Sequence, residues 1–78
     1  ISFADEKRRI GEAAAKLIAD NSTVLITGGT TTEAMLPYLG SIRGLTVLTN
    51  SLPIVTRLSQ YPDVAVVVLG GLLRRQEM

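Results

Sequence analysis

Three short apolar segments constrain the fold of this chain more than any other feature. They cover residues 23–27, 45–49 and 64–69. Each segment consists of apolar and β-branched residues throughout, without the alternation of a strand that has one face in water. Continuous apolar strands are typical of a parallel sheet that is covered by helices on both faces. We therefore expect three buried parallel strands.

Helical patterns precede and separate these strands. In residues 5–19, apolar side chains recur at helical spacing and charged side chains take the other side, which predicts an amphipathic helix. A second helix is predicted over 31–39, where Pro37 should shorten or bend it, and Gly40 fits a cap at its end. A third helix is predicted over 51–60. The alternation predicts an α/β fold, a three-layer, Rossmann-like parallel sheet with right-handed crossovers.

The residues that follow the three strands are small, polar or glycine. In a parallel sheet all strands end at one edge, and open α/β sheets bind ligands in the crevice at that edge. Helices that start after the first two strands would add free backbone N–H groups, which suit a phosphate or a carboxylate. The candidate residues at this edge are Gly28, Gly29, Thr30, Thr31, Thr32, Thr49, Asn50, Ser51, Gly70 and Gly71.

Each of these loops also has a purely structural explanation. Gly28 and Gly29 fit a tight turn that needs positive φ. Thr30 and Glu33 match a capping box, in which side chains satisfy the first N–H groups of a helix without any ligand. Residues 50–51 are likewise suited to cap the third helix. Local chemistry alone supports a capped turn and a ligand site about equally.

Composition and motif spacing limit the kinds of ligand and the cellular location that we expect. The chain has no cysteine and no histidine, and its carboxylates lack metal-ligand spacing, so we expect no metal and no cofactor. The net charge of +1 is too small for a broad nucleic-acid-binding surface. The longest apolar run is far shorter than the ~20 residues of a membrane span, and charges at 5–9 do not fit a signal peptide, which favours a cytoplasmic protein. The glycines lack the spacing of nucleotide-binding loops, which favours a smaller phosphorylated or carboxylated ligand.

Four motifs occur in consistent order along nearly the whole chain. They are Lys7-x-x-Ile10, Gly-Gly-Thr-Thr-Thr at 28–32, Leu-Thr-Val at 45–47 leading to Thr-Asn-Ser at 49–51, and Leu-Gly-Gly at 69–71. Together they resemble the sensor domain of DeoR-family transcriptional repressors. The resemblance implies a fold similar to pentose-phosphate isomerases and CoA transferases, the NagB/RpiA/CoA transferase-like fold, of which residues 1–78 would form the N-terminal half.

In such repressors, an N-terminal winged helix-turn-helix binds operator DNA and the sensor domain binds a phosphorylated sugar or related intermediate in a homo-oligomer. By resemblance, residues 28–32 would cradle the phosphate or sugar oxygens, 49–51 would line the next wall, and 70–71 would leave room for the ligand. Lys7 would add positive charge, although a solvated helix face explains it equally well. Many members carry an acidic residue where this chain has Thr27, which leaves the sugar open.

Both ends of the chain look cut, so we expect a partial sensor domain that lacks its DNA-binding module and the rest of the sensor fold. One alternative is an enzyme of the same fold, a sugar-phosphate isomerase or a CoA transferase. Such an enzyme needs a base or a carboxylate nucleophile, and near the crevice only Glu33 qualifies. Another is an interaction module, because a half-fold leaves an unpaired strand edge and apolar faces. The isolated chain is predicted to self-associate or to be marginally stable.

Overall fold

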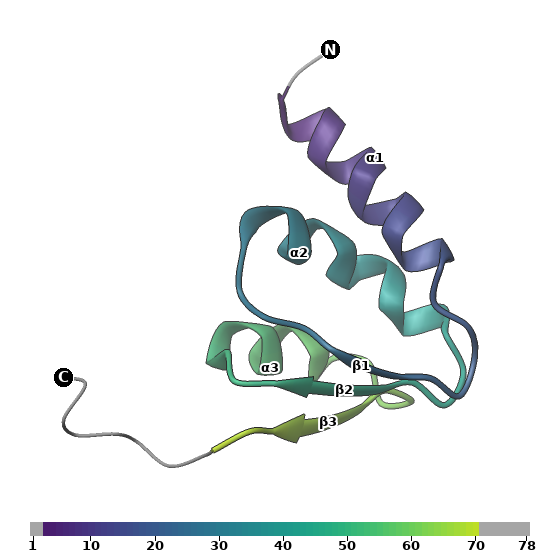
Figure 1. The fold of residues 1–78 in the computed structure, drawn as a ribbon, viewed down its shortest axis with the longest axis vertical. Helices are drawn as coiled ribbons and strands as arrows, with labels where there is room; N and C mark the ends of the chain where they lie inside the picture. The colour runs from purple at the N-terminus through teal and green to yellow at the C-terminus, as the bar shows by residue number, and fades with distance from the viewer. Residues whose placement is uncertain (1–2, 71–78) are drawn as a thin grey trace, which may run out of the picture.

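The computed structural model describes residues 3–70, in which helices and strands alternate (Figure 1). The elements are α1 (Phe3–Lys16), β1 (Thr23–Leu25), α2 (Thr30–Met35), the 3₁₀ helix η1 (Leu36–Ser41), β2 (Thr46–Thr49), α3 (Leu52–Leu58) and β3 (Ala65–Val68). This order confirms the predicted α/β fold. Within residues 3–70, no helix is both long and apolar enough to cross a membrane.

The three strands form one parallel sheet in the order β1-β2-β3. Its register pairs Val24 with Val47, and Val47 with Val66. Both connections between strands step in the same direction along the sheet. Because crossovers of parallel strands are right-handed, this order requires α2 and α3 to lie on the same face.

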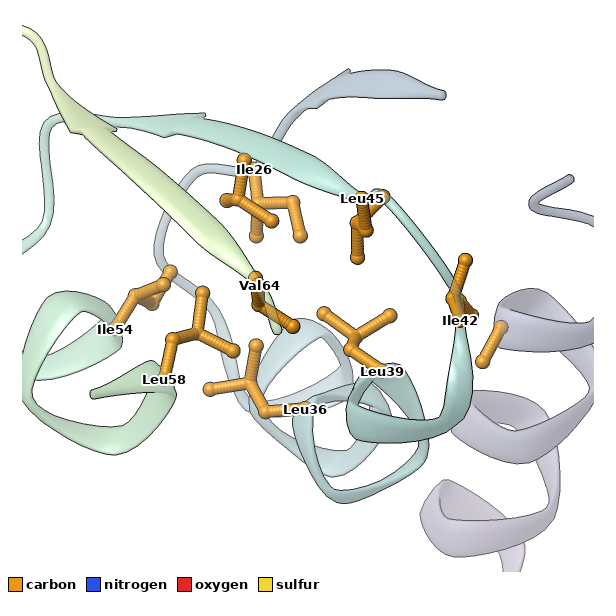
Figure 2. Packing of buried hydrophobic residues seen from close by; sticks show 10 residues of the cluster. Ile26, Leu36, Leu39, Ile42, Leu45, Ile54, Leu58 and Val64 are labelled. Atoms are coloured by element: carbon orange, nitrogen blue, oxygen red, sulfur yellow. The ribbon is translucent and has the colours of Figure 1, made fainter. Parts of the chain in front are cut away.

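The hydrophobic core lies between that face of the sheet and the helices. Figure 2 shows Ile26 and Leu45 on the strand side of this core, opposite Leu36, Leu39 and Leu58 on the helix side. The buried apolar residues are Ala15, Ile26, Leu36, Leu39, Ile42, Leu45, Val47, Ile54, Leu58 and Val64. Helix α1 packs against α2 and η1 instead of the sheet, and adds Ala15 to the edge of the core.

The opposite face of the sheet is open in the described part of the chain. Leu25 and Val67 on this face are 63% and 46% exposed. The continuous apolar strands had predicted helices on both faces, and residues 3–70 supply them on one face only. The reason is the order of the elements. A helix on the second face would need a crossover that steps in the reverse direction along the sheet. Helix α1 precedes the sheet and lies on α2.

Pro37 and Gly40 shape the second helical segment. A proline inside a helix lacks an N–H donor and clashes with the preceding turn, and here α2 ends at Met35 and continues as the 3₁₀ helix η1. The predicted shortening is therefore confirmed. The predicted cap at Gly40 is wrong, because Gly40 lies inside η1. A Cβ atom at this position would lie 2.6 Å from Cδ1 of Tyr61, so a side chain here would require the Tyr61 ring to move.

Two turns interlock at the edge of the sheet where the strands begin. The Asn21 N–H donates to the Arg43 carbonyl at 2.6 Å, and the Arg43 N–H donates to Oδ1 of Asp20 at 2.9 Å. Asn21 and Gly44 both have positive φ, of 61° and 64°. A Cβ atom on Gly44 would overlap Oδ1 of Asn21. These contacts fix the start of β2 beside the start of β1.

Candidate functional site

The loops that follow β1, β2 and β3 leave the sheet at the same edge. Hydrogen bonds extend the pairing one residue past the strand ends: the Ile26 N–H donates to the Leu48 carbonyl at 2.9 Å, and the Leu69 N–H donates to the Thr49 carbonyl at 2.8 Å. The chain therefore emerges from the three strands side by side. We call these loops, residues 26–30, 50–51 and 69–70, the strand-exit edge.

The two glycines of the first loop differ in conformation. Gly29 has φ 152° and ψ 151°, a region that residues with a Cβ atom rarely enter. Gly28 has no positive φ, and a Cβ atom there would meet nothing within 4 Å. The turn therefore requires glycine at position 29, whereas Gly28 faces open space at the surface.

Helix α2 starts without the predicted capping box. Gly29 is its N-cap, no side chain caps it, and Thr30 is already helical. The Glu33 N–H donates to the Gly29 carbonyl at 2.9 Å, while the Glu33 carboxylate lies 3.2 Å from Nη2 of Arg57 on α3. The capping box is therefore wrong, because the glutamate side chain pairs with another helix. Thr32 is half-buried on α2.

The second loop is held by its own hydroxyl groups. Thr49 is fully buried, and its Oγ1 accepts a hydrogen bond from the Ser51 N–H at 3.1 Å. Ser51 is the N-cap of α3 and its Oγ accepts from the Ile54 N–H at 3.5 Å, which confirms this cap. Thr49 and Ser51 thus shape the loop, and Asn50 is the exposed residue between them.

The remaining predicted residues lie at the limit of what the structure describes. Gly70 is exposed, with nothing within 4 Å of a Cβ atom placed on it. Gly71 and the side chain of Thr31 lie outside the described part. At the third strand exit, none of the described residues fills the space beside Gly70.

An open cavity of about 310 Å³ lies where α1, α2 and α3 approach each other. It is lined by Ala4, Lys7, Thr30, Glu33, Ala34 and Arg57. We call it the three-helix cavity. Of the predicted site residues, it brings together Lys7 and Thr30, which are far apart in the sequence. Of the other predicted residues that the structure describes, Thr32 lies on α2 and the rest lie along the strand-exit edge or beneath it, and none of them lines this cavity.

A close crossing of α1 over α2 positions Lys7. A Cβ atom on Gly11 would lie 2.6 Å from the Ala34 carbonyl carbon, so glycine allows the two helices to touch. Lys7, one helical turn earlier, is half-buried beside Ala34, and its Nζ lies 4.8 Å from the centre of the Phe3 ring. The crossing thus carries a lysine from α1 to the start of α2.

Arg57 and Glu33 were not predicted to act together. Their side chains are 54% and 37% exposed, and a solvent-exposed ion pair contributes only ~0–1 kcal/mol. No local motif marks Arg57, because its relation to α2 arises only from the packing of α3. With Lys7, the described residues that line the three-helix cavity include two cations and one carboxylate, so this lining carries a net positive charge.

A second cavity, of about 290 Å³, lies at the other end of α1. It is lined by Glu12, Ala15, Lys16, Ile18, Tyr38, Ser41 and Ile42. None of the predicted site residues within the described part lines it. The three-helix cavity is therefore the better candidate for a ligand site.

The chain is thus an α/β domain with a parallel sheet, with glycine and threonine at its strand exits, and with a positively charged cavity beside the first exit. The family of the chain is a narrower class than its fold. Residues 2–78 match the DeoR C terminal sensor domain. The chain belongs to this family, and the resemblance of its motifs to DeoR-family sensor domains is confirmed.

Relatives of known class are transcriptional regulators. The chain is 34% identical over 76 residues to the HTH-type transcriptional regulator IolR of Bacillus subtilis, which covers 97% of the chain and 30% of IolR. It is 42% identical over 74 residues to the HTH-type transcriptional repressor CsqR of Escherichia coli, which covers 95% of the chain and 28% of CsqR. The chain thus spans less than a third of the length of these relatives.

A solved structure supports the fold. Ribose 5 phosphate isomerase A from Neisseria gonorrhoeae superposes with a TM-score of 0.76 and 23% sequence identity, over 91% of the chain and 32% of the isomerase. At this identity the likeness concerns the fold alone. It confirms the expected isomerase-like arrangement of parallel strands and helices.

Proposed function

We propose that this chain is part of the effector-sensing domain of a transcriptional regulator, and that it binds a phosphorylated sugar or a related intermediate. The observation that carries the proposal is the three-helix cavity. There, Lys7 from α1 and Thr30 from the first strand exit lie at one positively charged opening. Binding sites for small molecules are concave and contain a few convergent polar groups of this kind.

The chemistry of the cavity suits an anion that also carries hydroxyl groups. Lys7 and Arg57 would neutralise a phosphate through charge-assisted hydrogen bonds, and the hydroxyl of Thr30 would donate or accept another. The strand-exit edge, with Asn50 and the open space at Gly28, would hold the sugar. A bare anion would use only the cavity, whereas a sugar phosphate would use both.

A named relative points to the same ligand class. The Glycerol-3-phosphate regulon repressor of Escherichia coli is 34% identical over 73 residues, which cover 94% of the chain and 29% of the repressor. The name of this relative refers both to glycerol 3-phosphate, a phosphorylated three-carbon compound, and to repression. In the full-length protein, we infer that ligand binding changes the affinity of a separate helix-turn-helix domain for operator DNA, in a cytoplasmic homo-oligomer.

An enzymatic function has less support. Isomerases and CoA transferases of this fold need a carboxylate that is available to the substrate. Among the described residues, Glu33 is the carboxylate that lines the three-helix cavity, and it pairs with Arg57 at 3.2 Å. We therefore propose a sensor that binds its ligand without chemical change.

Calorimetric titration of the full-length protein tests this proposal. The probes are glycerol 3-phosphate, ribose 5-phosphate, glucose 6-phosphate and the corresponding compounds without phosphate. At least one phosphorylated probe should bind, and Lys7→Gln should lower its affinity about tenfold or more, since hydrogen bonds to charged groups contribute ~1.5–3 kcal/mol. Lys16→Gln, at the other end of α1, is the matched control and should bind normally. Equal effects of both substitutions would contradict the proposed site.

A further inference from the structure

The Glu33–Arg57 ion pair forms part of the wall of the three-helix cavity. Nη2 of Arg57 lies 3.2 Å from Oε1 of Glu33. Both side chains also line the cavity together with Lys7 and Thr30. An arginine has five N–H donors, so one contact to a carboxylate leaves most of its hydrogen-bonding capacity unused.

The Glu33 carboxylate and the phosphate of an incoming ligand would compete for the Arg57 guanidinium. A guanidinium matches the geometry of phosphate as well as that of a carboxylate, and a phosphate carries more negative charge. Glu33 also brings a negative charge to the opening through which the ligand enters. Like charges repel at this range, so an anion binds better when Glu33 is neutral.

We propose that Arg57 is a specificity-determining residue that exchanges Glu33 for the phosphate of the ligand. Glu33 holds the guanidinium at the cavity wall in the unliganded protein and competes with the phosphate for it. This exchange rests on the proposed function, because it requires an anionic ligand in the cavity. The exchange favours strongly charged phosphate esters over singly charged carboxylates, because a singly charged ligand offsets less of the interaction energy of the lost ion pair.

The two partners of the pair therefore have opposite effects on affinity. In the full-length protein, Arg57→Gln should weaken binding of a phosphorylated probe about tenfold, whereas Glu33→Gln should strengthen it about threefold. Arg57→Lys keeps the charge and should recover part of the loss. Both effects should shrink at high salt, and neither should appear with the unphosphorylated form of the same sugar.

A purely structural ion pair predicts a different result. Each glutamine substitution breaks the same contact between α2 and α3, so both would then change affinity in the same direction and lower the melting temperature alike. Calorimetry of the wild type, Glu33→Gln, Arg57→Gln and Arg57→Lys proteins with glycerol 3-phosphate, ribose 5-phosphate and glucose 6-phosphate separates the two cases. Changes of the same sign, or no change, would overturn the exchange.

The wild-type titration separates this inference from the proposed function. If the wild-type protein binds none of the phosphorylated probes, both are wrong. If it binds a probe and the Lys7→Gln protein loses affinity, while Glu33 and Arg57 have no opposing effects, then only the exchange is wrong. Thermal melts of each variant verify that the exposed substitutions leave the protein folded.

Discussion

Neighbouring glycines at the first strand exit meet different demands. Position 29 needs a backbone conformation with φ 152°, and position 28 has an ordinary conformation beside open space. The turn therefore requires glycine at position 29, whereas at position 28 the absence of a side chain would leave room for the proposed ligand. Substitution by alanine distinguishes these two roles, because alanine adds only a Cβ atom.

Gly29→Ala should lower the free energy of unfolding by about 1–3 kcal/mol, the typical strain of a residue forced into this region. Gly28→Ala is the matched control and should leave stability unchanged or raise it by up to ~1 kcal/mol, because it restricts only the unfolded chain. Urea unfolding of the two full-length variants measures the difference. Equal losses at both positions would mean that the loop differs from the one described.

At the scale of elements, the crossing of α1 over α2 links the core to the three-helix cavity. Gly11 lies at the contact with the backbone of Ala34, and Lys7 lies one turn away at the cavity. A change in the spacing of the two helices would therefore also move the lysine away from Thr30. Stability and ligand affinity should change together at this crossing.

Gly11→Ala tests the crossing. Alanine is the better helix former by about 1 kcal/mol, yet its Cβ atom would lie 2.6 Å from the backbone of Ala34. Overpacking of this kind costs ~1–3 kcal/mol, so we expect a net loss of stability together with weaker binding of a phosphorylated sugar. Ala13→Ser, at an exposed position of the same helix, serves as the control. A more stable Gly11→Ala protein with unchanged affinity would show that the helices are not in contact here.

The elements themselves were predictable because each depends on a local pattern. The apolar runs predicted the strands, and Pro37 predicted the end of α2. The start of α2 was not predictable, since Thr30 and Glu33 satisfy the capping pattern and the glutamate is taken by Arg57 from a distant helix. Such a choice depends on tertiary packing, which local spacing does not contain.

Part of the candidate site was also predictable from the sequence. Parallel topology brought the strand exits together, and the family resemblance added Lys7, which the structure places with Thr30. Arg57 was missed because an arginine on the exposed side of a helix has no distinguishing pattern. Conversely, Thr49 was predicted to line the wall, and its burial shows that it supports the loop from beneath.

At the scale of the whole molecule, the described part is a sheet with helices on one face. Leu25 and Val67 lie exposed on the other face, and β1 and β3 are the outer strands. Unpaired strand edges and contiguous apolar surfaces are sites of association in water. The described part of the chain therefore has both features that promote contact between copies.

We expect the isolated 78-residue chain to self-associate or to melt without a cooperative transition. Leu25→Thr combined with Val67→Thr should reduce association in sedimentation velocity experiments, because both residues lie on the open face. Leu17→Thr removes an apolar side chain that is 87% exposed on the loop after α1, and should change association less. A monomeric wild-type chain with a cooperative, high-temperature melt would contradict this expectation.

The position of Gly11 within α1 has a mechanical consequence. From this crossing, α1 continues for two turns toward Phe3, away from the sheet (Figure 1). At 1.5 Å per residue, this arm is about 12 Å long, so a rotation of about 10° at Gly11 displaces its end by roughly 2 Å. Lys7 lies halfway along the arm, where the cavity opens. A rotation of this size would therefore displace Phe3 about twice as far as Lys7.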